Sequence, residues 1–143
     1  MQHSILYNEQ TFYKQFIDDL LHAKHEVIIE SPFITSNRME TLSPIFETLL
    51  AKEIEITLVT KYPGEHDEEF FRDQATEEIL SCVEMGVNVQ FVDGLHRKTA
   101  IIDREILYEG SLNILSQNNS REIMRRIDDK DEARKLLKFL KVF

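Results

Sequence analysis

Hydrophobic residues recur along the first two thirds of the chain in two alternating patterns, one typical of helices and one of strands. Three stretches repeat apolar residues at the three- and four-residue spacing of an amphipathic helix. The stripes consist of Phe12, Phe16, Ile17, Leu20 and Leu21; of Met39, Leu42, Ile45, Phe46, Leu49 and Leu50; and of Phe70, Phe71, Ala75, Ile79 and Val83. Asn8 is the expected N-cap of the first helix, and Gly86 is expected to end the third.

Short apolar runs follow these helices and predict buried strands. The runs are "EVIIES" at 26–31, "IEITLVT" at 54–60 and "VNVQFV" at 87–92. The first run leads into a loop, "SPFITSN", whose contact with substrate is a secondary expectation. Strands that alternate with helices are joined by right-handed crossovers, so this part of the chain predicts parallel pairing.

After residue 92 the pattern changes, because tight turns are expected to join short strands without intervening helices. The turns are "DG" at 93–94 and "DRE" at 103–105. A strand "REIMRRI" at 121–127 and a last helix with Ala133, Leu136, Leu137 and Leu140 complete the order. The expected fold class is α/β, with a mixed, mainly parallel central sheet flanked by helices. Residues 1–143 are expected to form one domain, since no repeat or linker divides them.

The composition is that of a globular protein, with 42% hydrophobic and 30% charged residues. No apolar run approaches the roughly 20 residues that cross a bilayer, and no signal peptide is recognisable. The single cysteine, Cys82, lies in an amphipathic stretch and is expected to be a buried, inert thiol. We therefore expect a cytoplasmic protein without stable membrane association.

The charged residues are unevenly distributed along the chain. The formal net charge of -9 weakly opposes a surface that grips nucleic acid or anionic lipid everywhere. Between Glu65 and Glu84 acidic residues surround one base, Arg72, as on a solvated helix face. Between Arg97 and Arg126 basic residues outnumber acidic ones. This second region predicts a locally positive field.

Residues 94–113, "GLHRKTAIIDREILYEGSLN", combine polar groups with strand-like residues. In a strand, residues two apart share a face, so His96 and Lys98 are expected to point the same way. A nucleophile or base then stands beside a fixed positive charge. Asp103 is expected to point the other way, and is better interpreted as the anchor of a turn or strand than as a direct catalyst.

The same stretch ends in a Gly-Ser-x-Asn element. Gly110 permits a close backbone turn, after which Ser111 and Asn113 offer a hydroxyl and an amide to a common point. Such donors suit phosphate oxygens. For Ser111, capping the turn is an alternative of equal weight.

Together these residues form the pattern H-x-K-x4-D, followed after six further residues by G-S-x-N. The pattern resembles the signature of the phospholipase D superfamily, and the similarity extends to "IIESPFI" at 28–34, to Glu122 and to the order of elements. Residues 109–127 also resemble single-motif domains at the ends of some bacterial helicase-like proteins. The resemblance implies a phospholipase D-like sandwich that cleaves or transfers phosphodiesters without a metal or other cofactor.

The resemblance further implies an active site built from two copies of the motif, whereas this chain has one. Family members of this length with one motif are homodimeric nucleases, so a homodimer acting on nucleic acid is expected. One His96 would attack phosphorus to give a phosphohistidine, and the other would protonate the leaving oxygen. Lys98 and Asn113 of both subunits would neutralise the charge on the phosphate oxygens.

The remaining candidates have supporting roles in this scheme. Ser111 would contact phosphate, Asp103 completes the motif, and Glu122 would hydrogen-bond the second ring nitrogen of His96. Pairing of Glu122 with Arg104 or Arg125 is its alternative. The candidate substrate-binding residues are Arg97, Arg121, Arg125 and Glu30, of which Glu30 is also a weaker candidate for supporting His96. The run Arg121, Arg125 and Arg126 has a plainer interpretation as a solvated edge.

Three functions of different classes follow. A nuclease is favoured, because the chain is compact and lacks a second motif. A lipid-directed phospholipase D or phosphatidyltransferase would need an apolar approach surface that the sequence does not display. A noncatalytic nucleic-acid-binding domain of a larger helicase-like protein is the third, which the intact His96, Lys98 and Asn113 oppose.

Overall fold

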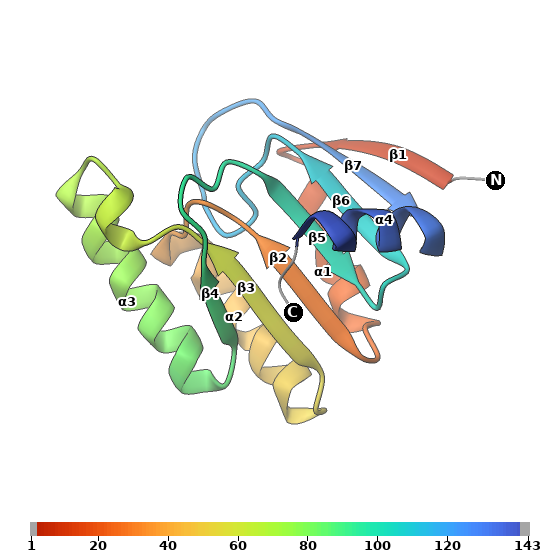
Figure 1. The fold of residues 1–143 in the computed structure, drawn as a ribbon, viewed down its shortest axis with the longest axis horizontal. Coiled ribbons are helices and arrows are strands. Elements are labelled where there is room, and N and C mark those ends of the chain that lie inside the picture. The colour runs from red at the N-terminus through yellow and green to blue at the C-terminus, as the bar shows by residue number, and fades with distance from the viewer. Residues whose placement is uncertain (1–2, 141–143) are drawn as a thin grey trace.

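The computed structural model describes residues 3–140, which form a seven-stranded sheet and four α-helices (Figure 1). The strands are β1 (His3–Asn8), β2 (Glu26–Glu30), β3 (Glu55–Thr60), β4 (Asn88–Phe91), β5 (Lys98–Ile102), β6 (Ile106–Gly110) and β7 (Ile123–Asp128). The helices are α1 (Phe12–Leu21), α2 (Ser36–Ala51), α3 (Glu69–Met85) and α4 (Lys130–Leu140), and a 3-10 turn, η1, spans Pro63–Glu65.

The sheet is mixed, as expected, in the strand order β1-β7-β6-β5-β2-β3-β4. Its pairings are not mainly parallel, which corrects that part of the expectation. In the described residues, β2 pairs with β3 and β3 with β4 in parallel, whereas the other four pairings are antiparallel. The reason is that β5 enters beside β2 in the reverse direction, and the following hairpin and loop continue the sheet on that side.

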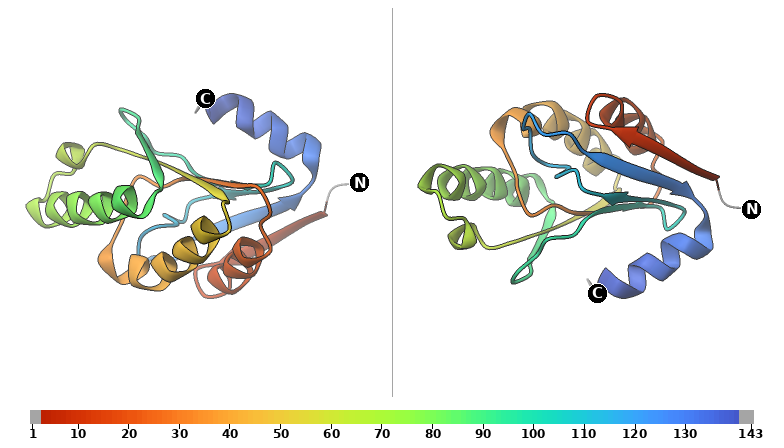
Figure 2. Two further views of the ribbon diagram at one scale, coloured as in Figure 1. Left: turned by 90° about the horizontal axis from the view of Figure 1, so that it is seen from below. Right: turned by 90° about the horizontal axis from the view of Figure 1, so that it is seen from above.

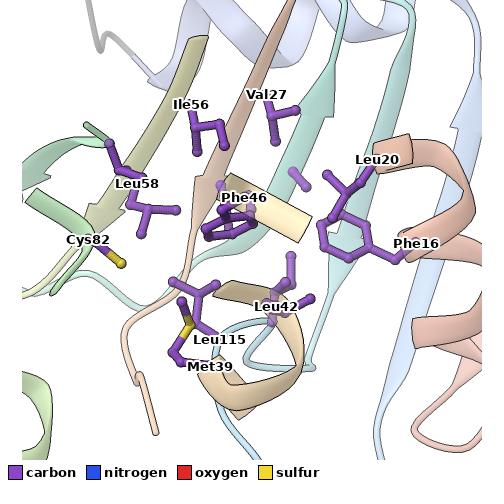
Figure 3. Packing of buried hydrophobic residues seen from close by; sticks show 14 of the residues in the cluster. Phe16, Leu20, Val27, Met39, Leu42, Phe46, Ile56, Leu58, Cys82 and Leu115 are labelled. Carbon is purple, nitrogen blue, oxygen red and sulfur yellow. The ribbon is translucent and has the colours of Figure 1, made fainter. Parts of the chain in front are cut away.

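The sheet lies between α1, α2 and α3 on one side and α4 on the other (Figure 2), and each side has its own hydrophobic layer. Helices α1, α2 and α3 cover one face, where their buried side chains pack with residues such as Val27, Ile29 and Leu58 (Figure 3). Helix α4 covers part of the opposite face through Ala133 and Leu140. Cys82 is buried in the larger layer, as predicted.

The predicted helices are confirmed, with differences at their ends. Gly86 ends α3 with a left-handed φ of 113°, as expected. Thr11, not Asn8, is the N-cap of α1, because the Asn8 side chain instead accepts hydrogen bonds from the backbone N–H groups of Gln10 and Thr11. In α3, Val83 is 53% exposed because this helix packs on the sheet only beside the edge strand β4.

Strand β1 was not predicted from the sequence. It pairs antiparallel with β7 at one edge of the sheet. Ile5 and Leu6, adjacent along this strand and therefore on opposite faces, are 49% and 55% exposed. The hydrophobic pattern therefore carries little sign of a buried face at this position.

Candidate active site

Most of the predicted site residues gather where several strands end together, at the upper end of the sheet in Figure 1. The register aligns Glu30 with Thr99, Lys98 with Gly110, and Gly110 with Met124. The carboxyl ends of β2 and β6 therefore meet the amino ends of β5 and β7. We call this edge the site end of the sheet.

His96 is exposed at the site end, immediately before β5. The expectation that His96 lies within a strand is wrong, because the strand begins at Lys98. Both neighbours of β5 end there, β2 at Glu30 and β6 at Gly110, so the chain before Lys98 has no backbone partner in the sheet. Lys98 is half-buried, and neither its side chain nor that of His96 forms a hydrogen bond or ion pair within residues 3–140.

Glu30 organises the residues between and after His96 and Lys98. One carboxylate oxygen accepts a hydrogen bond from the Arg97 guanidinium at 2.9 Å, and the other accepts one from the Thr99 hydroxyl at 2.9 Å. The side chain of Glu30 is 0% exposed, whereas that of Arg97 is 46% exposed. Direct substrate binding by Glu30 is therefore corrected to a positioning role, because its carboxylate is buried and engaged. Arg97 remains open to an anion.

The Gly-Ser-x-Asn element turns the chain from β6 into a loop that returns at β7. A Cβ on Gly110 would lie 2.1 Å from the carbonyl oxygen of Ile123, so only glycine fits against β7. Ser111 Oγ accepts a hydrogen bond from the Ile123 backbone N–H at 3.0 Å. The hydroxyl thus closes the base of the loop, in agreement with the capping interpretation.

The loop that carries Asn113 is held by two residues that sequence reasoning missed. The Tyr13 hydroxyl donates to the backbone oxygen of Ile114 at 2.7 Å, and Arg38 Nε donates to that of Ser116 at 3.3 Å. The Arg38 guanidinium also stacks on the Tyr13 ring, 3.5 Å from its centroid. We call this pair the loop clamp. Its members lie on α1 and α2, and no motif marks them.

The amide of Asn113 is incompletely satisfied. Its Oδ1 is buried and has no hydrogen-bond partner within the described residues. Buried polar atoms without partners are uncommon and often mark sites that bind a ligand or water. Asn113 lines a hollow of about 150 Å³ together with Glu122 and Arg38. The structure thus brings two predicted residues, Asn113 and Glu122, to one polar hollow.

Glu122 does not contact His96 in the part of the chain that the structure describes. Its backbone N–H donates to Glu9 Oε1 at 2.8 Å, and this hydrogen bond is the main cause that lowers the pKa of Glu9. The two alternative partners of Glu122 are engaged elsewhere, since Arg104 pairs with Glu26 and Arg125 donates to Ser4. The predicted support of His96 by Glu122 within one chain is not observed.

Asp103 lies at the other end of β5. The strand separates it from Lys98 by roughly 16 Å at about 3.3 Å per residue. Its carboxylate accepts hydrogen bonds from the backbone N–H groups of Lys24, His25 and Glu26 at 2.8 to 3.0 Å. This geometry agrees with the expected anchoring role and gives Asp103 no direct part in chemistry at His96.

The predicted basic run divides into different environments. Arg121 and Arg125 are exposed, so they remain available to an anionic substrate. Arg126 instead forms a two-pronged ion pair with buried Asp19, at 2.8 and 3.0 Å, beside the Tyr108 hydroxyl. The interpretation of Arg126 as part of a solvated edge is wrong, because its guanidinium compensates the negative charge of the buried Asp19 carboxylate.

Similarity to known proteins identifies the family. The family model described as "Cardiolipin synthase, PLD-like domain" matches residues 16–142, so the chain belongs to this family of phospholipase D-like domains. The superfamily consists of phosphodiesterases, which agrees with the His-Lys-Asn groups at the site end. A search among curated proteins found no match.

Solved structures share the fold over nearly the whole chain. NucT from Helicobacter pylori is 21% identical with a TM-score of 0.73, covering 97% of this chain and 93% of that one. Nuc from Salmonella typhimurium, a phospholipase D family member, is 12% identical with a TM-score of 0.77, covering 97% and 91%. Phosphatidylserine synthase from Haemophilus influenzae is 13% identical with a TM-score of 0.63, covering 99% and 38%.

Residues 3–140 contain no cluster of three or more His, Cys, Asp or Glu side chains suited to hold a metal ion. None of their helices has the length and apolar character required to span a membrane.

Proposed function

We propose that this protein is a metal-independent phosphodiesterase that cleaves nucleic acid in a homodimeric active site. The observation that carries the proposal is the exposed His96 two residues before Lys98, which pairs with Gly110 of the Gly-Ser-x-Asn element, together with the buried Asn113 Oδ1 that has no hydrogen-bond partner in the described residues. A structural histidine or lysine would be expected to use its hydrogen bonds within the fold. These groups instead remain available to a phosphate.

The chemistry proceeds by double displacement. A ring nitrogen of one His96 attacks phosphorus, a P–N bond forms, and the P–O bond to the leaving group breaks. His96 of a second copy gives its proton to the leaving oxygen. Water then attacks the phosphohistidine, gives a proton back to the second His96 and releases the phosphate product. No oxidant, reductant or metal enters this balance.

A second copy is required because each chain supplies one His-x-Lys pair, His96 and Lys98, that is followed by the downstream Asp and Gly-Ser-x-Asn. A two-fold axis at the site end would bring two exposed histidines to one phosphorus. Lys98 and the Asn113 amide of each copy would then neutralise the phosphate oxygens as negative charge develops. Glu122 has no contact with His96 in its own chain, so its proposed contact is with His96 of the second copy.

Nucleic acid is favoured over lipid because the hollows at the site end are lined by polar and aromatic side chains. A lipid-processing enzyme would need an aliphatic surface there. Phosphatidyl transfer is the second candidate, since the matching family description names cardiolipin synthase and one similar structure is phosphatidylserine synthase. A noncatalytic role within a helicase-like protein stays a prediction.

The first experiment measures cleavage of single-stranded and double-stranded DNA and RNA in excess EDTA. We expect cleavage that survives chelation and is abolished by His96→Ala. His25→Ala is the matched control, because His25 is an exposed histidine near the opposite end of the sheet. Phosphatidylglycerol vesicles provide the lipid substrate. Lipid turnover without nucleic acid cleavage would establish the second candidate, and unchanged cleavage by His96→Ala would refute the mechanism.

Mixing subunits tests the shared site. When wild-type and His96→Ala chains are co-refolded in equal amounts, heterodimers should be inactive, because each catalytic cycle needs both histidines. Specific activity should then fall to about one quarter of that of wild type by random pairing. A fall to one half would mean that each subunit acts alone.

A further inference from the structure

Beside the site end lies a small hollow that the proposed chemistry does not use. It has a volume of about 170 Å³ and is lined by Phe33, Lys61, His66 and Phe71, together with the acidic residues Glu65, Asp67 and Glu68. The Phe33 ring lies 4.8 Å from the His66 ring and 5.8 Å from the Phe71 ring, between centroids. Lys61 Nζ lies 4.6 Å from the centroid of Phe33. We call this group the aromatic hollow.

His66 is the least satisfied member of the aromatic hollow. Its side chain belongs to a residue that is 4% exposed, and its Nδ1 is buried without a hydrogen-bond partner in the described residues. Burial, and then the nearby Lys61, lower the pKa of this imidazole, so the ring stays neutral near pH 7. A neutral imidazole offers one donor and one acceptor. Because a buried polar atom without a partner is uncommon, this ring points to a ligand.

Hydrogen bonds of Ser31 connect the aromatic hollow to the loop that carries Asn113. The Ser31 hydroxyl donates to the backbone oxygen of Phe33 at 2.8 Å and accepts a hydrogen bond from the backbone N–H of Leu115 at 3.1 Å. One buried serine therefore sets the distance between the hollow and the loop that carries Asn113.

We propose that the aromatic hollow receives an unpaired nucleobase of the strand whose phosphate lies at His96 and Asn113, an inference that rests on the proposed function. Faces of Phe33 and Phe71 are suited to stacking, which tolerates any base. His66 Nδ1 and the exposed carboxylates of Asp67 and Glu68 are suited to accept hydrogen bonds from the amino and imino N–H groups on a base edge. An acyl chain would leave these polar groups buried and unsatisfied. Lys61 would meet a neighbouring phosphate.

This assignment predicts the strand preference. A base inside a duplex cannot enter a hollow of about 170 Å³ unless it leaves the helical stack, which costs free energy. A base in a single strand can enter the hollow without this free-energy cost of leaving a duplex. The enzyme is therefore expected to cleave single strands in preference to duplexes.

The test compares three substrates: a single-stranded oligonucleotide, the same backbone with abasic residues, and bis(4-nitrophenyl) phosphate. For wild type, abasic substitution should lower kcat/KM about 5- to 150-fold, the range that stacking of one base supplies. Phe71→Ala should lose a similar factor on the normal strand and nothing further on the abasic one. Its activity on bis(4-nitrophenyl) phosphate should stay at the wild-type level. Phe139→Ala, which removes a 71% exposed phenylalanine of α4, is the matched control.

The outcomes separate the two proposals. If wild type cleaves both oligonucleotides equally, or if Phe71→Ala loses the same factor on all substrates, the base site is wrong while the phosphodiesterase stands. If wild type cleaves none of the three, both proposals fail. Should Phe71→Ala not fold, as judged by circular dichroism, Phe71→Leu keeps the packing volume without the aromatic face. Lys61→Gln gives an independent readout, a rise of KM on the oligonucleotide alone.

Discussion

Asp103 shows how one residue of a catalytic-looking motif can serve the fold. It occupies a left-handed backbone conformation, with φ of 55°, in the turn between β5 and β6. Its carboxylate receives three backbone N–H groups from the segment that enters β2. Asp103 therefore ties a hairpin turn to the neighbouring strand at the end of the sheet remote from His96.

Asp103→Ala is expected to lower the free energy of unfolding by about 3 kcal/mol, because backbone donors lose a charged acceptor. The kcat of the folded variant should stay at the wild-type level. Urea denaturation and steady-state kinetics at a temperature where the variant is folded check both values. His96→Ala should show the reverse pattern, with stability retained and kcat lost. Loss of kcat in a folded Asp103→Ala enzyme would restore a catalytic role.

His66 predicts a pH dependence of stability. Burial is the main cause that lowers its pKa below the ordinary 6.5, so the unfolded chain takes up the proton at a higher pH than the folded one. The contribution of His66 to stability is therefore present above pH 6.5 and is lost as pH falls below it. Urea denaturation from pH 7.5 to 5 should show this loss. His66→Gln should reduce the slope, whereas His25→Gln, at an exposed position, should keep it.

At the scale of elements, the loop between β6 and β7 is the part whose shape matters most for the site. Its buried residues Leu112, Ile114 and Leu115 hold it in the larger hydrophobic layer. The loop clamp of Tyr13 and Arg38 holds its backbone from α1 and α2. Helices far away in the sequence thus set the position of the Asn113 amide.

Removal of the Tyr13 hydroxyl from the loop clamp should lower kcat more than it changes KM. Tyr13→Phe frees the carbonyl of Ile114 and lets Asn113 move, so kcat on bis(4-nitrophenyl) phosphate should fall about 10-fold, which corresponds to about 1.4 kcal/mol. KM should change less than twofold. Tyr7→Phe, in strand β1, is the matched control and should leave kcat unchanged. A rise of KM at constant kcat would mean that Tyr13 contributes to binding instead.

At the scale of the whole molecule, the net charge of -9 must be reconciled with the proposed nucleic acid substrate, which is a polyanion. The exposed bases Arg97, Arg121 and Arg125 would have to offset the acidic remainder locally. In a homodimer these bases are doubled around a shared site. Affinity should therefore depend on salt through the few phosphates that these residues contact.

For a single-stranded oligonucleotide with His96→Ala enzyme, log Kd against log salt should be linear. Its slope should change by about 0.7 for each phosphate contact that is removed. Arg121→Gln and Arg125→Gln should each reduce the slope by this amount if the residue contacts phosphate. Fluorescence anisotropy measures the affinity, and Arg134→Gln, on α4, is the control. If the Kd of the His96→Ala enzyme, without any arginine substitution, did not change with salt concentration, this would count against nucleic acid as the substrate.

The sequence predicted the four helices and most of the strands, and each success has a physical basis. Helix and strand periodicities come from burial of one face, which the linear pattern records. Strand β1 was missed because Ile5 and Leu6 of this edge strand are both about half exposed. Mainly parallel pairing was wrong because the direction in which β5 enters the sheet depends on contacts between distant segments.

The motif from His96 to Asn113 was visible in the chain because its spacing is local. Which residues lie close together in space depends on contacts between distant segments. The roles of the motif residues could therefore be inferred only from the packing. Three groups of contacts join segments between 67 and 101 residues apart: those of buried Glu30 with Arg97 and Thr99, those of Asp103 with the start of β2, and the loop clamp. Amino-acid spacing therefore indicated which groups could act on a phosphodiester, whereas burial and long-range hydrogen bonding showed which of these groups hold the scaffold together.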